Sequence, residues 1–332
     1  MSAVPASTLG VVVFTYNHAR FLRDTLAGIC AQSRRPDRIL VCDDASPADS
    51  EADLAAIVAE FPGVELHRNA ENFGAVANFR QGIERVGCDA YMLHAGDDRL
   101  VDRDFLRDAE AILRAHPSVV VVHGMIRRAT PDGTLLGPDL PRADAPYRVL
   151  SGEAMRRRLA YINPVAAPCT LIRRSVHAHV PPFPIPSRAR HDWQQWYLLS
   201  YFGDFARIER PVMESFVHGD NLSVGRAQNL ALHRALRKDY EDLLARPEIR
   251  PEDADRLRAG LLPLDLQGTP IHELGEVLWH HRSEAGVARE LGHTLARRLG
   301  MRLLDFAARG ERAAIEQRVG GRLDLAVADE RD

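Results

Sequence analysis

Acidic residues that follow apolar runs are the side chains of this chain best suited to chemistry. Asp43-Asp44 and Asp97-Asp98 are pairs of this kind, and His191-Asp192 and a segment from His218 to Asn221 follow later. In an open α/β sheet the carboxyl ends of the parallel strands form the ligand crevice, so these acids are expected to converge there. Carboxylates that gather without equal basic neighbours require a cation, and oxygen ligands suit Mg²⁺ or Mn²⁺.

The elements that must position these acids alternate between strand and helix in the first part of the chain. Strands are predicted at residues 9–15, 38–42, 64–67, 90–94 and 119–123, and helices at residues 49–60, 73–86 and 102–116. A further helix follows Asn17, which is expected to cap it. Strands that alternate with helices of about 10–15 residues indicate right-handed crossovers and a mostly parallel sheet. The fold class is therefore predicted to be α/β.

The alternation breaks after residue 124. Residues 125–136, centred on Pro131-Asp132-Gly133, predict a hairpin. Late strands are predicted at residues 205–208 and 212–217, and the pattern becomes helical from residue 223 onward. We therefore divide the chain into a domain at residues 1–224, with halves at 1–124 and 125–224, and a helical C-terminal extension at residues 225–332.

Composition and charge exclude several classes of function. The chain has 332 residues and a net charge of -3, so it lacks the basic excess that is typical of nucleic-acid-binding proteins. Its four cysteines form no C-x-x-C pair, which predicts free thiols in a reducing compartment. The first ten residues do not resemble a secretion signal, and no run reaches the roughly 18 apolar residues of a membrane span. The expected location is the cytoplasm, with the inner face of the cell membrane as an alternative.

Several short motifs resemble those of the inverting family 2 glycosyltransferases, which have the GT-A fold. Phe14-Thr15-Tyr16-Asn17 is similar to the P-T-Y-N of the first strand, with phenylalanine in place of proline. Cys42-Asp43-Asp44-Ala45-Ser46 is similar to V-D-D-G-S, and Asn72-Phe73-Gly74 to the N-x-G before the third helix. Gly96-Asp97-Asp98 resembles the D-x-D region, and His191-Asp192 stands where the family has E-D. The resemblance implies a Rossmann-like, mostly parallel central sheet flanked by helices, with a nucleotide-binding first half and an acceptor-binding second half.

The resemblance implies that one group of residues binds the sugar nucleotide. Asp44 would accept a hydrogen bond from the imide N–H of uracil or thymine, because an ionised carboxylate only accepts. The base and ribose would be lined by Thr15, Tyr16 and Asn17. Further donor contacts are expected from Asn72 and Asn78; the alternative is a helix cap at the former and a surface position for the latter.

A second group is expected to hold a divalent metal, Mn²⁺ or Mg²⁺. Asp98 is the expected direct ligand of the metal, and Asp97 is the expected contact to the ribose or the sugar. The opposite assignment of the two residues is the alternative. His218 is expected as a third ligand or a diphosphate contact, with a packed or solvated histidine as the alternative. Many relatives have an acid two positions before Asp97, whereas this chain has Ala95. The competing interpretation is that both acids are N-caps of the following helix.

Asp192 is the expected catalytic base. Inversion at an anomeric carbon requires one base that removes the proton of the acceptor hydroxyl as it attacks. The alternative is a simple N-cap for a helix that starts at Trp193. Contacts to acceptor or diphosphate are expected, with weaker support, from His191, Arg99, Asn221 and Ser223.

The resemblance therefore implies transfer of a sugar from a UDP- or dTDP-type donor to a glycan or lipid-linked acceptor, in bacterial polysaccharide, O-antigen or glycolipid synthesis. One alternative is a catalytically inactive sugar-nucleotide-binding or scaffold protein, which Ala95 and His191 make conceivable. A nucleotidyltransferase would need a glycine- and basic-rich loop after the first strand, and this chain has none there. Apolar residues at helical spacing from Val287 to Leu303 predict a helix that packs on the domain or forms a homodimer. The flanking arginines offer a second interpretation, contact with an anionic membrane.

Overall fold

The continuous apolar run near the N-terminus forms the central strand of the sheet. β1 (Leu9–Thr15) pairs in parallel with β2 (Arg38–Asp43) on one side and with β4 (Ala90–Ala95) on the other. β2 also pairs in parallel with β3 (Val64–Arg68), which forms the edge. A strand with neighbours on both sides and helices on both faces has no polar surface to present, which explains the unbroken apolar sequence of β1.

The computed structural model describes residues 7–130, 132–136, 145–160, 163–185, 191–217 and 230–258. The chain divides into two compact units, residues 1–260 and 261–332, and every element below belongs to the first. The predicted helix from Val287 to Leu303 therefore lies outside the described residues. Within the described part of the chain, no helix is long and apolar enough to cross a membrane.

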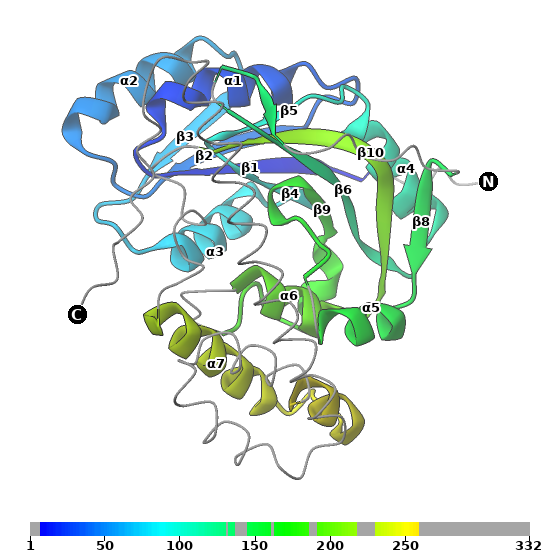
Figure 1. The fold of residues 1–332 in the computed structure, drawn as a ribbon. Helices are drawn as coiled ribbons and strands as arrows, with labels where there is room; N and C mark the ends of the chain where they lie inside the picture. The colour runs from blue at the N-terminus through cyan, green and yellow to red at the C-terminus, as the bar shows by residue number, and fades with distance from the viewer. Residues whose placement is uncertain are drawn as a thin grey trace, which may run out of the picture. The chain divides into compact units, whose positions relative to one another are not determined.

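The second half of the sheet is mixed. It contains β5 (Asp98–Leu100), β6 (Val119–Ala129), β7 (Leu135–Leu136), β8 (Tyr147–Leu150), β9 (Thr170–Arg173) and β10 (Asp204–Phe216). β9 pairs antiparallel with both β4 and β6, and β10 pairs in parallel with β6 and antiparallel with β5 and β8. Among the described residues the strand order is β3-β2-β1-β4-β9-β6-β10-β5, so a parallel first half continues into a mixed second half (Figure 1).

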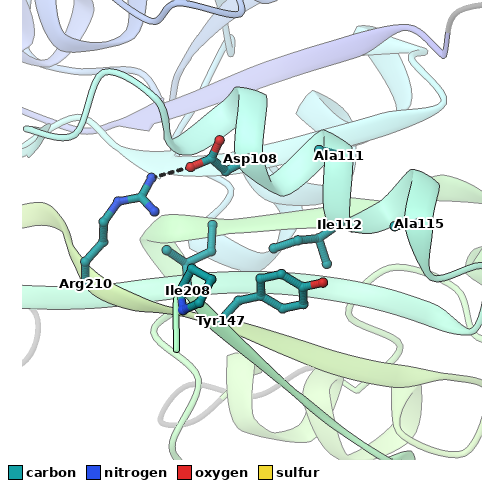
Figure 2. A pocket seen from close by; sticks show the side chains of 8 residues that line it. Asp108, Ala111, Ile112, Ala115, Tyr147, Ile208 and Arg210 are labelled. Atoms are coloured by element: carbon teal, nitrogen blue, oxygen red, sulfur yellow. Dashed lines mark hydrogen bonds and ion pairs between the residues drawn. The ribbon is translucent and has the colours of Figure 1, made fainter. Parts of the chain in front are cut away.

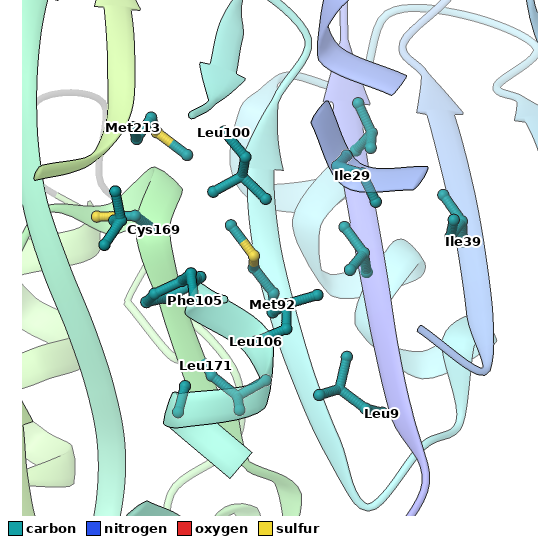
Figure 3. Packing of buried hydrophobic residues seen from close by; sticks show 14 of the residues in the cluster. Leu9, Ile29, Ile39, Met92, Leu100, Phe105, Leu106, Cys169, Leu171 and Met213 are labelled. Atoms are coloured by element: carbon teal, nitrogen blue, oxygen red, sulfur yellow. The ribbon is translucent and has the colours of Figure 1, made fainter. Parts of the chain in front are cut away.

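Helices cover both faces of the parallel half. α1 (Ala19–Cys30), α2 (Ala48–Ala59) and α4 (Phe105–Ala115) contribute to the main apolar core, together with alternate residues of β1. Figure 3 shows part of this core, including Leu9, Ile29, Met92, Phe105 and Leu171. α3 (Ala75–Val86) covers the opposite face and approaches β1 closely, because a Cβ on its Gly82 would lie 2.4 Å from Val12.

The later helices pack against one another. They are α5 (Gly152–Leu159), α6 (His191–Leu199), α7 (Leu230–Leu244) and a helix at residues 251–258. Two short 3₁₀ helices flank β9, at Ala167–Cys169 and Arg174–Ala178. The ring of Trp193 in α6 lies 4.3 Å from that of Tyr240 in α7, centroid to centroid. α7 therefore packs on α6 within the first of the two units.

The α/β class and the mostly parallel sheet flanked by helices are confirmed, and three local predictions need comment. The hairpin predicted over residues 125–136 is present as the antiparallel pair of β6 and β7. The two predicted late strands form one strand, β10, whose register with β6 shifts on both sides of Pro211. Asn17 does not cap α1; its φ is 60°, and His18 occupies the N-cap position. The helix begins one residue later than predicted because Asn17 completes the turn after β1.

Candidate functional site

The carboxyl ends of β1, β2 and β4 bring together the three motifs that begin at Phe14, Cys42 and Gly96. The register places Thr15 opposite Asp43 and Phe14 opposite Ala95. The backbone N–H of Asp44 donates to the carbonyl of Thr15 at 2.9 Å, and that of Gly96 donates to the carbonyl of Phe14 at 2.9 Å. The loops that carry the predicted donor-binding residues therefore leave the sheet side by side.

Close packing at this edge explains the glycine of the Gly-Asp-Asp motif. A Cβ on Gly96 would lie 3.0 Å from both Cβ and Oγ1 of Thr15, so a larger residue would push the two strand ends apart. Thr15 is 2% exposed, whereas Tyr16 is 47% exposed and Phe73 is 46% exposed. Two large aromatic side chains are therefore exposed to solvent at this edge of the sheet, Tyr16 after β1 and Phe73 before α3.

Asp44 is held by the segment that precedes α3. Its Oδ1 accepts hydrogen bonds from Nδ2 of Asn69 at 2.8 Å and from the backbone N–H of Phe73 at 3.0 Å. Its Oδ2 accepts from the backbone N–H of Gly74 at 2.9 Å, which also donates to Oδ1 of Asn72 at 3.1 Å. A carboxylate has about four lone-pair positions, so Oδ2 keeps one for a further donor.

Asp43 closes the turn after β2. It is 1% exposed, and its carboxylate accepts from the backbone N–H of Ser46 at 3.1 Å and from the hydroxyl of Ser46 at 2.5 Å. Arg68 Nη1 donates to the same carboxylate at 3.0 Å and so compensates the buried charge. Asn17 joins this turn through its backbone N–H, which donates to the Ser46 hydroxyl at 2.8 Å.

Asn78 lies beneath the site and not on its surface. It is 3% exposed, so the surface position considered in the sequence analysis is wrong. Its Nδ2 donates to the carbonyl of Cys42 at 3.0 Å, and its Oδ1 accepts from Nδ2 of Asn69 at 3.2 Å. Asn69 thereby links Asn78 to Asp44. Sequence reasoning missed Asn69 and Arg68, although both stand at the end of β3, the same kind of strand-end position that identified Asp44.

Asp97 and Asp98 follow β4 and are both buried, at 8% and 4% exposure. His18 Nδ1 lies 3.7 Å from Oδ1 of Asp97, which connects this motif to the start of α1. Burial and the neighbouring Asp97 raise the pKa of Asp98 to about 7, against hydrogen bonds from the Ser215 side chain and the Phe216 backbone that lower it. Asp98 is therefore protonated in part at neutral pH, because the described part of the protein compensates its charge only in part.

The donor chemistry of this pair fits a divalent cation. Two adjacent carboxylates, one of them with a raised pKa, are oxygen ligands of the kind that Mg²⁺ and Mn²⁺ bind together with phosphate oxygens and water. Within the described residues, no group of three or more His, Cys, Asp and Glu side chains is arranged to hold a metal ion. His218, the third ligand expected from the sequence, lies outside the described residues, as do Asn221 and Ser223.

Asp192 lies in the first turn of α6 and is partly exposed. Its Oδ2 accepts a hydrogen bond from Nδ2 of Asn163 at 2.8 Å, which fixes the orientation of the carboxylate. Trp193, the next residue, is fully buried and donates its indole N–H to the carbonyl of Leu159 at 2.6 Å. Trp193 thus holds α6 in place, and Asp192 lies partly exposed at the N-terminal end of the helix. His191 is the first residue of α6.

The segment before α6 is fastened to α3 through Phe183. This residue is 2% exposed and has a φ of 46°, and its ring lies 5.2 Å from that of Phe79. Phe79 lies in turn 4.3 Å from Phe14 of β1, ring centroid to ring centroid. Arg80 of α3 donates to the carbonyl of Phe183, and the backbone N–H of Phe183 donates to the side-chain carbonyl of Gln195 in α6. These contacts connect the helix that carries Asp192 to α3 and β1.

A pocket lies elsewhere, between α4, β8 and the first half of β10. Figure 2 shows the residues that line it: Asp108, Ala111, Ile112, Ala115, Pro146, Tyr147, Ile208 and Arg210. Its one guanidinium group, that of Arg210, pairs with Asp102 at 2.5 Å and with Asp108 at 2.7 Å. The pocket is therefore mostly apolar, and the charges that it has compensate each other. None of the predicted site residues lines it.

Comparison with known proteins matches this arrangement to one family. The family model described as glycosyl transferase family 2 matches residues 10–180. Among solved structures, S. aureus TarS 1-349 in complex with UDP-GlcNAc is similar with a TM-score of 0.61 and 13% identity, covering 97% of this chain and 95% of that chain. The mannosyltransferase PcManGT from Pyrobaculum calidifontis, in complex with GDP-Man and Mn²⁺, gives a TM-score of 0.58 and 17% identity, covering 88% and 81%. No curated protein matches the chain. The two structural likenesses confirm the predicted GT-A fold.

Proposed function

Because the chain belongs to glycosyl transferase family 2, we propose that it is an inverting glycosyltransferase that uses a UDP- or dTDP-sugar. The observation that carries the proposal is the convergence of the Thr15, Asp44 and Gly96 loops at the carboxyl edge of three parallel strands. The exposed rings of Tyr16 and Phe73 lie at that edge, together with the buried acids Asp97 and Asp98. Such a site suits a ligand with a flat base and a charged diphosphate.

The base of the donor is proposed to lie between Tyr16, Phe73 and Asp44. The exposed rings supply flat apolar surface, and the free lone-pair position of Asp44 Oδ2 supplies an acceptor for an imide N–H. Thr15 and Asn17 line the same loop, and Asn72 borders it from the α3 side. TarS was solved with UDP-GlcNAc and PcManGT with GDP-Man, so nucleoside diphosphate sugars are the donors to test first.

The diphosphate is proposed to lie next to Asp97 and Asp98, which would hold Mn²⁺ or Mg²⁺ together with His218. A bound cation would supply Lewis-acid compensation of the charge that develops on the departing diphosphate. PcManGT was solved with Mn²⁺, which supports a metal test for this chain. Asp98 is the proposed direct ligand, since the described residues compensate its buried charge only in part and a cation would add to that compensation.

Asp192 is proposed as the base that removes the proton of the acceptor hydroxyl. Asn163 occupies Oδ2 and thereby leaves Oδ1 to receive that proton. The role needs a carboxylate that an acceptor can reach, and Asp192 is partly exposed where its helix begins.

We place the acceptor among glycans and lipid-linked glycans of bacterial polysaccharide, O-antigen or glycolipid synthesis. Residues 225–332 are proposed as the segment that contacts a membrane or a second copy of the chain.

The donor is tested by thermal shift with nucleotides and nucleotide sugars, each with and without Mn²⁺. UDP- or dTDP-compounds should stabilise the protein, and the metal should increase the shift, because both ligands bind only the folded state. Equal shifts with and without metal would argue against the proposed cation.

The base is tested with Asp192→Asn, which keeps the size and the contact to Asn163. Turnover of the donor identified by the screen should fall by about a hundredfold or more, with nucleotide affinity nearly unchanged. Asp204→Asn is the control, since Asp204 accepts from the backbone N–H of Gly152 at 2.9 Å and lies at the start of β10. Equal turnover in the wild type and Asp192→Asn rules out this base. Nucleotide binding without turnover by the wild type, with any acceptor, would point to the inactive binding protein.

A further inference from the structure

Two arginines share one buried glutamate next to the Asp97-Asp98 motif. The register places Arg99 of β5 opposite Glu214 of β10, and Glu214 opposite Arg127 of β6, so the three side chains lie abreast on three strands. Arg99 Nη2 lies 2.6 Å from one carboxylate oxygen of Glu214, and Arg127 Nη2 lies 2.9 Å from the other. Arg99 and Arg127 are named the arginine pair below.

The arginine pair has more hydrogen-bond donors and more positive charge than Glu214 satisfies. Two guanidinium groups face a single carboxylate, which leaves one net positive charge among these described side chains. The Nε atoms of both arginines are buried and have no hydrogen-bond partner among the described residues. Side-chain exposure is 36% for Arg99 and 34% for Arg127, against 7% for Glu214, so a ligand can reach the pair while the glutamate anchors it from below.

The place of the pair relates it to the acceptor side of the site. Arg99 follows Asp98 directly, and its guanidinium carbon lies 5.4 Å from the ring centroid of Phe216 at the end of β10. The Phe216 ring is 6.1 Å from that of Phe21, in the first turn of the helix that follows the donor loop. Arg127 belongs to the half of the domain after residue 124, for which the resemblance to the family implies acceptor binding.

We propose that the arginine pair binds a phosphate-type anion carried by the acceptor. A planar guanidinium group matches the oxygens of phosphate, and two of them on one rigid sheet form a preorganised receptor. The inference rests on the proposed function, which assigns the donor diphosphate to the cation at Asp97 and Asp98. It narrows the acceptor to a class, a glycan or lipid-linked glycan with a phosphate group near the reacting hydroxyl.

The chain contains a matched control at the other end of β10. Arg207 and Arg148 also share one carboxylate, that of Glu209, at 2.9 Å and 3.6 Å. Here both Nε and Nη2 of Arg207 donate to Glu209, so its Nε is not left without a partner as in the arginine pair. This second group adjoins β8, near the start of β10, and no predicted site residue stands next to it. Arg207→Gln therefore removes the same chemistry from the same strand without touching the arginine pair.

Calorimetric titration of inorganic phosphate into the protein saturated with UDP and Mg²⁺ tests the proposal. The wild type should bind phosphate, Arg127→Gln should weaken that affinity about tenfold or more, and Arg207→Gln should leave it unchanged. Glu214→Gln provides an independent variant if Arg127→Gln does not fold. It removes the competing carboxylate and should tighten phosphate binding, whereas a purely structural ion group gives no gain.

The outcomes separate this inference from the proposed function. Equal phosphate affinity in Arg127→Gln and Arg207→Gln, or no phosphate binding by the wild type, overturns the anion site. If Arg127→Gln weakens UDP and leaves phosphate unchanged, the pair binds the donor and the acceptor assignment is wrong. If no nucleotide binds the wild type, the proposed function fails by itself, and the same variants titrated without nucleotide still decide the anion site.

Discussion

Ala45 has a backbone conformation that residues with a side chain seldom adopt. Its φ is 58°, within the turn that Asp43 and Ser46 close, and the family pattern has glycine at this position. Replacement by glycine removes the contact of Cβ with the backbone but adds freedom to the unfolded chain. Ala45→Gly should therefore raise the free energy of unfolding by up to about 1 kcal/mol in urea denaturation.

The same substitution in a helix has the opposite sign and serves as control. Ala55 is an exposed residue inside α2, so Ala55→Gly should lower the free energy of unfolding by about 1 kcal/mol. If both variants were destabilised to the same extent, the turn at Ala45 would not be strained.

The free energy of unfolding should depend on pH through the buried side chain of His123. Burial lowers the pKa of this histidine to about 4, so it is neutral in the folded protein and protonates in the unfolded chain below about 6.5. The contribution of neutral His123 to the free energy of unfolding is complete above the pKa of the unfolded state. It is lost as the pH falls towards the pKa of the folded state, and the loss is on the order of 3 kcal/mol. His123→Gln should flatten unfolding free energy between pH 6.5 and 4 in urea titrations, and an unchanged slope would contradict this.

At the scale of single residues, the sequence identified which acids follow strands but not what binds them. Asp44 looked like an open acceptor, yet the backbone of Phe73 and Gly74 and the side chain of Asn69 already use three of its positions. These partners come from a segment about thirty residues away, and no local pattern in a sequence encodes such a pairing. The burial of Asn78, which contradicts its alternative surface position, depends on long-range pairing in the same way.

At the scale of elements, the contacts of Phe183 should decide how well α6 is positioned. Phe183→Ala removes a buried ring that packs on Phe79, so unfolding free energy should fall by about 3 kcal/mol. Turnover should fall with it, while nucleotide affinity stays close to that of the wild type, because α6 carries the proposed base and not the donor loops. Urea denaturation and calorimetry measure the two effects.

Phe202 offers a matched control for this change. It is 37% exposed, and its ring stacks on His179 at 4.9 Å between centroids. Phe202→Ala should cost about 1 kcal/mol or less and leave turnover unaltered. Loss of activity in both variants alike would remove the special role of Phe183.

The strands of the parallel half could be predicted because each is a run of apolar residues with clear boundaries. β5 was missed because its three residues are too short for any periodicity, and it forms only because β10 lies alongside. Two strands were predicted where the structure has only β10. Pro211, which separates them, falls at a register shift of that strand, where its missing N–H is tolerated. Tertiary pairing therefore decided both cases.

At the scale of the whole molecule, Asp253 ties the segment after α7 to the sheet-bearing unit. It is 2% exposed, accepts from the hydroxyl of Tyr201 at 2.7 Å, and lies 3.3 Å from Nε of Arg156 in α5. Asp253→Ala leaves the Arg156 charge buried without compensation, so the free energy of unfolding should fall by about 3–5 kcal/mol. Urea denaturation should still show one transition, because the segment is part of the same unit.

Asp255, two residues further on, provides the comparison. Its side chain is 78% exposed and pairs with Arg258 at 2.8 Å, so Asp255→Ala should change stability by less than about 1 kcal/mol. Similar effects of the two substitutions would mean that residues 251–258 are not integral to the unit.

The extent of this unit could not be predicted from motifs. The family match ends at residue 180, whereas the compact unit continues to residue 260. Motifs mark where chemistry requires particular residues, but packing partners such as Trp193 and Tyr240 need only size and apolarity, which many sequences satisfy. Asp192, which its similarity to the E-D of the family identified as the proposed base, likewise lies beyond the matched residues.

The phenylalanine that replaces the usual proline of the first-strand motif has a consequence for evolution. The ring of Phe14 packs edge-on against Phe79, and Phe79 packs on Phe183, so three side chains from distant segments form one contiguous aromatic cluster. A homologue that has proline at the first of these positions loses one end of the cluster, and selection should then relax on the other two. Aligned homologues should accordingly show these three positions changing together, as a signature inherited by one branch of the family.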